Sequence, residues 1–318
     1  MSARIERPPC LWSSGEDVYA SASRATLRGA ANGDGECVRR SGRSQFQPRE
    51  LTLRFERTRA TAEKNQLGGS GVTTADVALG GGTRCLAAVT ADLVNVAAST
   101  AAASNAAGSS AMKNEGSIFF DVSLGGMMGA GGGARGQARR AASAYSASAS
   151  TPGRVRGNAL TSSADAEEAR IVLCRGLERM IREGRALDLE ALSVVPGKLV
   201  WSVRCDVRVL DNCGNVAEAV SLAALAALQA HRLPDVSVDA GVGVGAPPTV
   251  TVHSSDTHET APLPLHFVPV TVGFALLSED GECLIADPDI EEEAASDGTI
   301  HVSMNAQGEV CGVTKVWR

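Results

Sequence analysis

The chain has 318 residues, of which 44% are hydrophobic and 21% are charged. This length and composition are typical of a globular protein with one large or two small domains. The net charge of −6 excludes a uniformly basic nucleic-acid binder but leaves room for a local basic patch, and no stretch reaches the roughly 18 uninterrupted apolar residues of a membrane span.

The first 40 residues are polar, contain both basic and acidic side chains, and lack the apolar stretch of a secretory leader. We therefore predict a disordered extension over 1–40, with a transit peptide as the alternative.

Two further runs, 96–113 and 129–164, are rich in Gly, Ala and Ser. Such mixtures cannot bury enough apolar surface to offset the ordering of the backbone, so we predict mobile inserted loops. The second loop carries five arginines and has no acid before Asp165. A solvated low-complexity expansion is our interpretation, and an arm that touches RNA is the alternative.

Alternation and β-branched residues predict strands over 51–55, 83–94 and 117–124. A helix is predicted over 164–186, because acids crowd its first turns and arginines its last, which suits the helix dipole.

The clearest predicted strand covers 198–210. One set of alternate residues is apolar and should face the core: Trp201, Val203, Cys205, Val207 and Val209. The other set forms a charged ladder, in which Asp206 can be neutralised by Arg204 and Arg208.

A turn over 211–215 then leads into a helix from about Val216 to Ala230. Ala and Leu residues occupy nearly every face of this helix, so it should be buried, most simply against a sheet. A glycine turn before a helix N-terminus can bind an anion, but this turn contains no Lys, Arg, Ser or Thr to complete a phosphate site.

The last third of the chain predicts mostly strands, within 236–238, 249–252, 265–277, 282–288, 299–305 and 308–317, with a short acidic helix at 289–295. We predict an α+β protein whose mixed β-sheets are covered by a few long helices. The sequence "IEEEAA" within the short helix is interpreted as a capped, solvated turn.

The eight cysteines form no CxxC pair, and most of them lie in apolar runs. A free cysteine in such a run behaves as a small hydrophobic residue. We expect a reducing compartment, with neither a disulfide framework nor a cysteine zinc site.

Seven blocks occur in an order that resembles the RNase PH family, and specifically the ring subunits of the eukaryotic RNA exosome of the exosome component nine type. They are "GGTRCLAAVTADLV", "NEGSIFFDVSL", "LERMIREGRALDLEALSVVPGKLVWSVRCDVRVLDNCGN", "AALAALQAHRLPDVSV", "PLPLHFVPV", "ADPDIEEE" and "SMNAQGEVC". The resemblance implies the RNase PH-like fold, which is similar to domain 2 of ribosomal protein S5. It also divides the chain into domain 1 over 41–262 and domain 2 over 263–318.

The sequence departs from the family pattern at three places. An N-terminal Asp-Gly-Arg is replaced by Ser41-Gly42-Arg43, the Asp-Gly-Asn turn by Cys213-Gly214-Asn215, and Pro-Met by Gly126-Met127. These changes make the N-terminal element and the loop after Leu124 the weakest parts of the match.

Phosphorolysis needs a phosphate held by cationic or hydroxyl side chains, together with an acid near the leaving 3′ end. The resemblance implies Thr or Ser and Arg at the turn of active members, where this chain has Asn215, Val216 and Ala217. Asp235 and Asp239 lie downstream and read as acids at the ends of strands. We therefore predict no catalytic residue, no cofactor and no metal; a phosphorolytic 3′→5′ exoribonuclease is the alternative, and an interaction protein that uses its inserted loops is a weaker one.

Arg175, Arg179 and Arg182 are spaced i, i+4 and i+7, and Arg185 falls near the same stripe. A solvated face with pairs to Glu178 and Glu183 is one interpretation. The other is a row that contacts RNA phosphates, as the resemblance implies for related non-catalytic subunits.

Two smaller signals complete the candidates. Arg84 is either an RNA contact or part of a salt bridge at a strand end. The stretch 253–259 has two His and two acids, but without helical or strand register it is interpreted as a solvated loop.

The resemblance implies a structural, RNA-guiding subunit that supports rRNA maturation and mRNA turnover. Its expected partners are other RNase PH-like subunits in a six-membered ring of heterodimers, RNA-binding cap subunits, an associated nuclease and single-stranded RNA, but no membrane. The expected location is the nucleus, including the nucleolus, and the cytoplasm.

Overall fold

The computed structural model describes residues 39, 41–58, 70–80, 82–95, 115–124, 163–239, 249–253, 258–276 and 284–317. The predicted extension over 1–40 lies outside the described residues except for Arg39, which is 1% exposed, so the prediction of disorder is wrong for this residue. The predicted loop over 96–113 and nearly all of the loop over 129–164 also lie outside them. The second loop ends earlier than predicted, because residues 163 and 164 begin a helix, and the remainder of these three interpretations stays a prediction.

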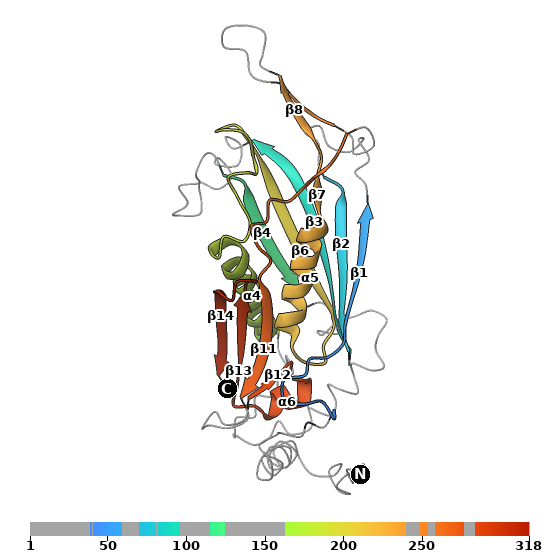
Figure 1. Cartoon of the computed structure of the whole chain (residues 1–318), viewed down its shortest axis with the longest axis vertical. Helices are drawn as coiled ribbons and strands as arrows, with labels where there is room; N and C mark the ends of the chain where they lie inside the picture. Colours follow the sequence, from blue (N-terminus) through green and yellow to red (C-terminus); the bar gives the residue numbers. More distant parts are fainter. Residues whose placement is uncertain are drawn as a thin grey trace, which may run out of the picture.

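The larger sheet has six strands in the order β1-β2-β3-β6-β4, with β5 paired to β6 (Figure 1). Its strands are β1 (Leu51–Thr58), β2 (Val72–Leu79), β3 (Thr83–Asn95), β4 (Ser117–Ser123), β5 (Ser193–Val195) and β6 (Leu199–Asp211). All neighbours are antiparallel except β4 and β6, which are parallel.

One face of this sheet forms the core of the protein. All five apolar residues predicted to point inward from β6 are buried, and β3 alternates in the same way from Cys85 to Leu93. Helix α5 (Val216–Ala230) packs on this face, where Ala219, Ala223 and Ala227 are fully buried. The prediction of a buried helix against a sheet is confirmed.

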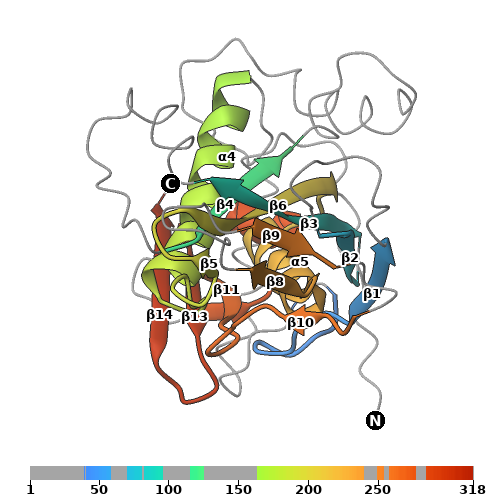
Figure 2. The ribbon, with the colours of Figure 1, turned by 90° about the horizontal axis from the view of Figure 1, so that it is seen from above.

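Helix α4 (Ser163–Glu178) lies beside β4, at the edge of the sheet (Figure 2). Its last turn reaches the same core as α5 through Leu177. Within the described residues, no helix has the length and apolar character needed to cross a membrane.

The predicted helix over 164–186 is not α-helical to its end. From Arg179 to Glu183 it continues as a π-helix, η1, in which Gly184 N donates to Arg179 O at 2.9 Å and Ala186 N donates to Ile181 O at 3.0 Å. A Cβ atom at Gly184 would lie 2.5 Å from Met180 O, so this close approach needs glycine. The wider turn adds a residue, and the α-helical spacing used to place three arginines on one face does not hold through η1.

A second sheet has the order β12-β11-β13-β14 and lies at the end of α5 where the turn over 211–215 is found (Figure 1). The remaining elements are β7 (Arg232–Leu233), β8 (Val236–Asp239), β9 (Thr249–Val252), β10 (Ala261–Pro262), β11 (Val270–Leu276), β12 (Leu284–Ala286), α6 (Ile290–Ala295), β13 (Gly298–Met304) and β14 (Val310–Trp317). The predicted α+β class with mixed sheets covered by helices is confirmed.

Candidate functional site

The last two residues of the turn before α5, Gly214 and Asn215, are buried. The last of them, Asn215, is fully buried and has a left-handed backbone with φ of 57°. The backbone N–H of Asn215 donates to Glu293 Oε1 of α6 at 2.7 Å. A carboxylate of this chain therefore already lies at the end of the helix where an external anion would bind.

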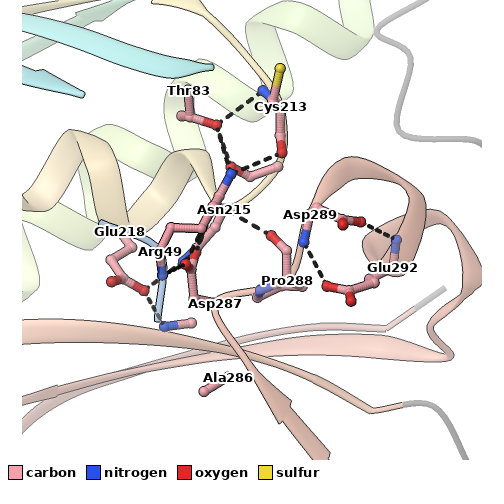
Figure 3. Close-up of polar contacts among 12 residues, drawn as sticks. Arg49, Thr83, Cys213, Asn215, Glu218, Ala286, Asp287, Pro288, Asp289 and Glu292 are labelled. Atoms are coloured by element: carbon pink, nitrogen blue, oxygen red, sulfur yellow. Dashed lines mark hydrogen bonds and ion pairs between the residues drawn. The ribbon is translucent and has the colours of Figure 1, made fainter. Parts of the chain in front are cut away.

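Two more carboxyl groups meet at the Asn215 side chain (Figure 3). Its Nδ2 donates to Glu218 Oε2 at 2.6 Å and to Asp287 Oδ1 at 2.7 Å. Glu218 Oε2 also accepts from the backbone N–H of Gly273 at 2.9 Å, which ties α5 to β11. Burial raises the pKa of Glu218.

Arg49 is the main cation of this cluster, and it is bound on all sides. Its Nη2 donates to Asp287 Oδ1 at 2.7 Å, and the guanidinium also donates to the carbonyl oxygens of Cys213 and Gly214, both at 3.1 Å. The Arg49 side chain is only 6% exposed. Burial alone would raise the pKa of Asp287, but hydrogen bonds from Arg49 and Asn215 outweigh it and lower the pKa to about 2.

Two arginines from the N-terminal segment complete the cluster. Arg39 donates to both carboxylate oxygens of Glu292, at 2.8 and 2.5 Å, and to Ala286 O at 2.7 Å. Arg43 Nη1 lies 3.1 Å from Asp287 Oδ2. The segment that departs from the family pattern at Ser41 is thus held against α6 and β12.

The acidic helix was interpreted as a capped, solvated turn. The cap is confirmed, because Asp289 and Glu292 form a capping box. The solvated interpretation is wrong for Glu292 and Glu293, which are 5% and 8% exposed, because both carboxylates bind groups from distant parts of the chain.

Across the cluster, five carboxyl groups face three guanidinium groups. They are Glu218, Asp287, Asp289, Glu292 and Glu293 against Arg39, Arg43 and Arg49. The nearby hydroxyl of Thr83 is also engaged, since it donates to Gly214 O at 2.7 Å and accepts from Cys213 N at 3.0 Å. This end of α5 therefore has no spare positive charge or free hydroxyl among its described neighbours to hold a phosphate.

The sequence did not single out Arg39, Arg49 or Asp287. The resemblance marked the neighbourhood, through the altered element at Ser41–Arg43 and the block "ADPDIEEE", but gave these residues no role. The partners are separated by more than 230 positions in the sequence, so no local pattern connects them.

The arginines of the long helix are all on the surface. Arg175, Arg179, Arg182 and Arg185 are exposed, and Arg179 Nε lies 3.8 Å from Glu183 Oε2. No carboxylate of the described residues lies within 4.0 Å of Arg175, Arg182 or Arg185. The salt bridges expected for a solvated face, to Glu178 and Glu183, are thus mostly absent from the described structure. RNA binding by this row of arginines stays a prediction.

Arg84 has a partner on the neighbouring strand. Its Nε and Nη2 donate to the two carboxylate oxygens of Asp76 at 2.9 and 2.5 Å, and these hydrogen bonds lower the pKa of Asp76. This geometry favours the salt-bridge interpretation of Arg84 over an RNA contact.

The two histidines of 253–259 do not lie in an isolated loop. His253 directly follows β9, and Asp235, on the other side of the β8–β9 hairpin, lies close to both His253 and His258. The interpretation that these histidines lack strand register for a metal is therefore wrong for His253. Asp239, the last residue of β8, is a strand-end acid as predicted.

Family models cover most of the described chain. Residues 74–234 match "3′ exoribonuclease family, domain 1", and residues 267–316 match "3′ exoribonuclease family, domain 2".

Among curated proteins, the chain is 40% identical over 148 residues to exosome complex component RRP45A of Arabidopsis thaliana, a match that covers 46% of this chain and 47% of that protein. It is 36% identical over 143 residues to exosome complex component RRP45 of Homo sapiens, a match that covers 45% of this chain and 31% of that protein. It is 40% identical over 149 residues to exosome complex component Rrp42 of Pyrococcus abyssi, a match that covers 47% of this chain and 50% of that protein. The chain thus spans half or less of the length of these relatives.

A solved structure with the same fold is the Archaeoglobus fulgidus exosome with RNA bound to the active site. The TM-score is 0.58 at 21% identity, and the match covers 94% of this chain and 87% of that chain. The predicted RNase PH-like fold is confirmed.

Proposed function

Because the chain belongs to the RNase PH family, we propose that it is a non-catalytic, structural and RNA-guiding subunit of an exosome core ring. In this role it supports 3′→5′ RNA processing and degradation, including rRNA maturation and mRNA turnover, without breaking the RNA itself. The names of its relatives support the exosome assignment, and the contacts around α5 support the non-catalytic one.

One observation carries the non-catalytic assignment. Asn215, where a phosphate-holding side chain would stand, is buried and donates to Glu218, Asp287 and Glu293. A phosphate entering here would meet carboxylates at close range and would have to displace charge-assisted hydrogen bonds, each worth about 1.5–3 kcal/mol. Weak binding by leftover backbone amides would not offset that cost.

The RNA-guiding assignment rests on the exposed arginines Arg175, Arg179, Arg182 and Arg185. A guanidinium presents a rigid fork that matches phosphate oxygens. Three of the four have no described carboxylate within salt-bridge distance, so their charge is available to RNA. The π-helical segment spreads these residues over a wider arc than a straight α-helix would, and we propose a patch of contacts and not a single line.

The proposed partners are other RNase PH-like subunits, one of them in a heterodimer within a six-membered ring, with cap subunits and a nuclease attached to it. Two sheet edges support partner binding. Every residue of β1 is exposed, including Leu51, Leu53 and Phe55, and β14 exposes Val310, Val313 and Val316. Exposed apolar edge strands are typical of surfaces that a partner covers. The proposed location is the nucleus, including the nucleolus, and the cytoplasm.

The proposal is tested by replacing Arg175, Arg179 and Arg182 together with Ala and measuring the affinity of the co-purified assembly for single-stranded RNA at several salt concentrations. Each lost phosphate contact should flatten the log–log salt dependence by about 0.7 while assembly stays normal. A control that replaces the exposed Lys198, Arg204 and Arg208 removes the same charge from another surface and should keep the slope.

An unchanged slope in the first variant with normal assembly would contradict the RNA-guiding role. Loss of assembly would instead assign these arginines to a subunit interface. If the tagged chain co-purifies with no RNase PH-like subunit, the ring assignment itself fails.

A further inference from the structure

The β8–β9 hairpin lies at the end of the molecule opposite to α6 (Figure 1). Its register pairs Val236 with Val252, and the ladder extends by one further hydrogen bond, from His253 N to Asp235 O at 2.9 Å. Asp235 and His253 are therefore held opposite each other by backbone structure and not by a flexible loop.

His258 joins this pair from the segment that leads into β10. Its Nδ1 lies 3.3 Å from Asp235 Oδ2, and its ring stacks on that of His253 with centroids 3.9 Å apart. One ligand atom from each of the three side chains lies within 4.8 Å of the others. The Asp235 and His258 side chains are 53% and 44% exposed, so an ion from solution can reach them.

Two imidazoles and one carboxylate form a common ligand set for zinc. Bonds of about 2.0–2.2 Å in a tetrahedron place neighbouring ligand atoms about 3.3–3.6 Å apart, and the distance between Asp235 Oδ2 and His258 Nδ1 is 3.3 Å. We propose that Asp235, His253 and His258 form a binding site for a zinc-type divalent cation, with the fourth position open to water.

A fourth residue prepares His253 for this role. Its Nε2 is hydrogen-bonded to the hydroxyl of Ser237, two residues after Asp235 on β8. When Nε2–H donates to Ser237 Oγ, the lone pair of Nδ1 is left for the ion. An outer partner of this kind fixes the tautomer and the orientation of a ligating imidazole.

Binding requires one movement. The two rings are stacked at 20°, so their in-plane lone pairs cannot both point at one ion as they stand. The exposed His258 ring must rotate about its side-chain bonds, whereas His253 and Asp235 stay in the hairpin ladder. Ion binding should therefore break the imidazole stack.

The site lies far from the N-terminus of α5, so the ion would not act in RNA cleavage (Figure 1). It would cross-link the β8–β9 hairpin to the segment that enters β10, and we assign it a structural role. This inference does not depend on the proposed RNA function.

The test is a zinc titration of the full chain by calorimetry, with unfolding temperature and histidine NMR as further readouts. The wild type should bind one more equivalent of zinc than Asp235→Asn or His258→Asn, because the eight cysteines contribute equally to all variants. Ser237→Ala should lower the affinity for this additional zinc ion by about 10-fold or more. His258 resonances should shift as the stack breaks.

The matched control is His266→Asn. His266 Nε2 lies 3.7 Å from Asp188 Oδ2, and this His–Asp pair is also partly exposed, but no third ligand joins it in the described structure. This variant should bind zinc as the wild type does. Equal zinc binding by the wild type, Asp235→Asn and His258→Asn would overturn the proposal, as would an equivalent that is lost in His266→Asn.

Discussion

Replacing Asp287 with Asn should destabilise the protein strongly, because Asn has the same shape but lacks the charge that balances two largely buried guanidinium groups. Asp287 is 1% exposed and binds both Arg43 and Arg49. Removing one partner of a buried ion pair costs about 3–5 kcal/mol. We expect a loss of this size in the free energy of unfolding, measured by urea denaturation at neutral pH.

The pH dependence gives a second measure of the same interaction. The pKa of Asp287 is lowered from 3.8 to about 2 in the folded protein. At about 1.36 kcal/mol per pKa unit, this corresponds to roughly 2–3 kcal/mol of stability. Because the folded pKa is lowered, that stability is present above pH 3.8 and is lost as the pH falls toward 2.

Burial raises the pKa of Glu218 and Asp289. Their effect on the pH dependence of the free energy of unfolding is therefore opposite in sign to that of Asp287. The difference between wild type and Asp287→Asn isolates Asp287. It should shrink by roughly 2 kcal/mol between pH 4 and pH 2, where half of the folded molecules still carry the charge. Asp76→Asn is the control, because its partner Arg84 is 51% exposed and the pair should be worth at most about 1 kcal/mol. A loss below 1 kcal/mol for Asp287→Asn, with the pH profile of the wild type, would refute the reasoning.

Three further changes test local packing and burial. Gly273→Ala should destabilise the protein by about 1–3 kcal/mol, because the new Cβ would clash with Asn215 Oδ1. Gly176→Ala in α4 should stabilise it by about 0.5–1 kcal/mol, because a Cβ there meets no atom within 4 Å. Urea denaturation of both variants measures these changes. Burial lowers the pKa of His231 to about 4, so protonation of this imidazole destabilises the fold as the pH falls from 6.5 toward 4. His231→Asn should reduce the fall in the free energy of unfolding over this range. An unchanged pH profile would contradict a buried neutral imidazole.

Periodicity in the sequence was enough to predict the elements of the core. Helix α5 has the predicted bounds, and the alternation of β6 predicted which five side chains are buried. Burial alone explains both successes, because a face that packs on a core must be apolar. Strand β2 escaped prediction because its alternation is blurred. Polar Thr73 lies on the buried face with Ala75, Val77 and Leu79, and apolar Val72 and Ala78 lie on the outward face.

The other parts that were missed leave no mark in the local sequence pattern. The π-helical turn at Arg179–Glu183 is a shift of hydrogen bonds that leaves the helical composition unchanged. Asp235 approaches His253 only through the register of a hairpin, and Asp287 meets Arg49 only when the second sheet packs below α5. No local pattern contains that information.

The most direct test of the non-catalytic assignment is a nuclease assay of the purified chain with single-stranded RNA, in the presence and absence of inorganic phosphate. The cluster around Asn215 predicts no release of nucleoside diphosphates or nucleoside monophosphates under either condition. Phosphate-dependent trimming of the RNA from its 3′ end that disappears in Asn215→Ala would contradict the account and establish the chain as a phosphorolytic exoribonuclease.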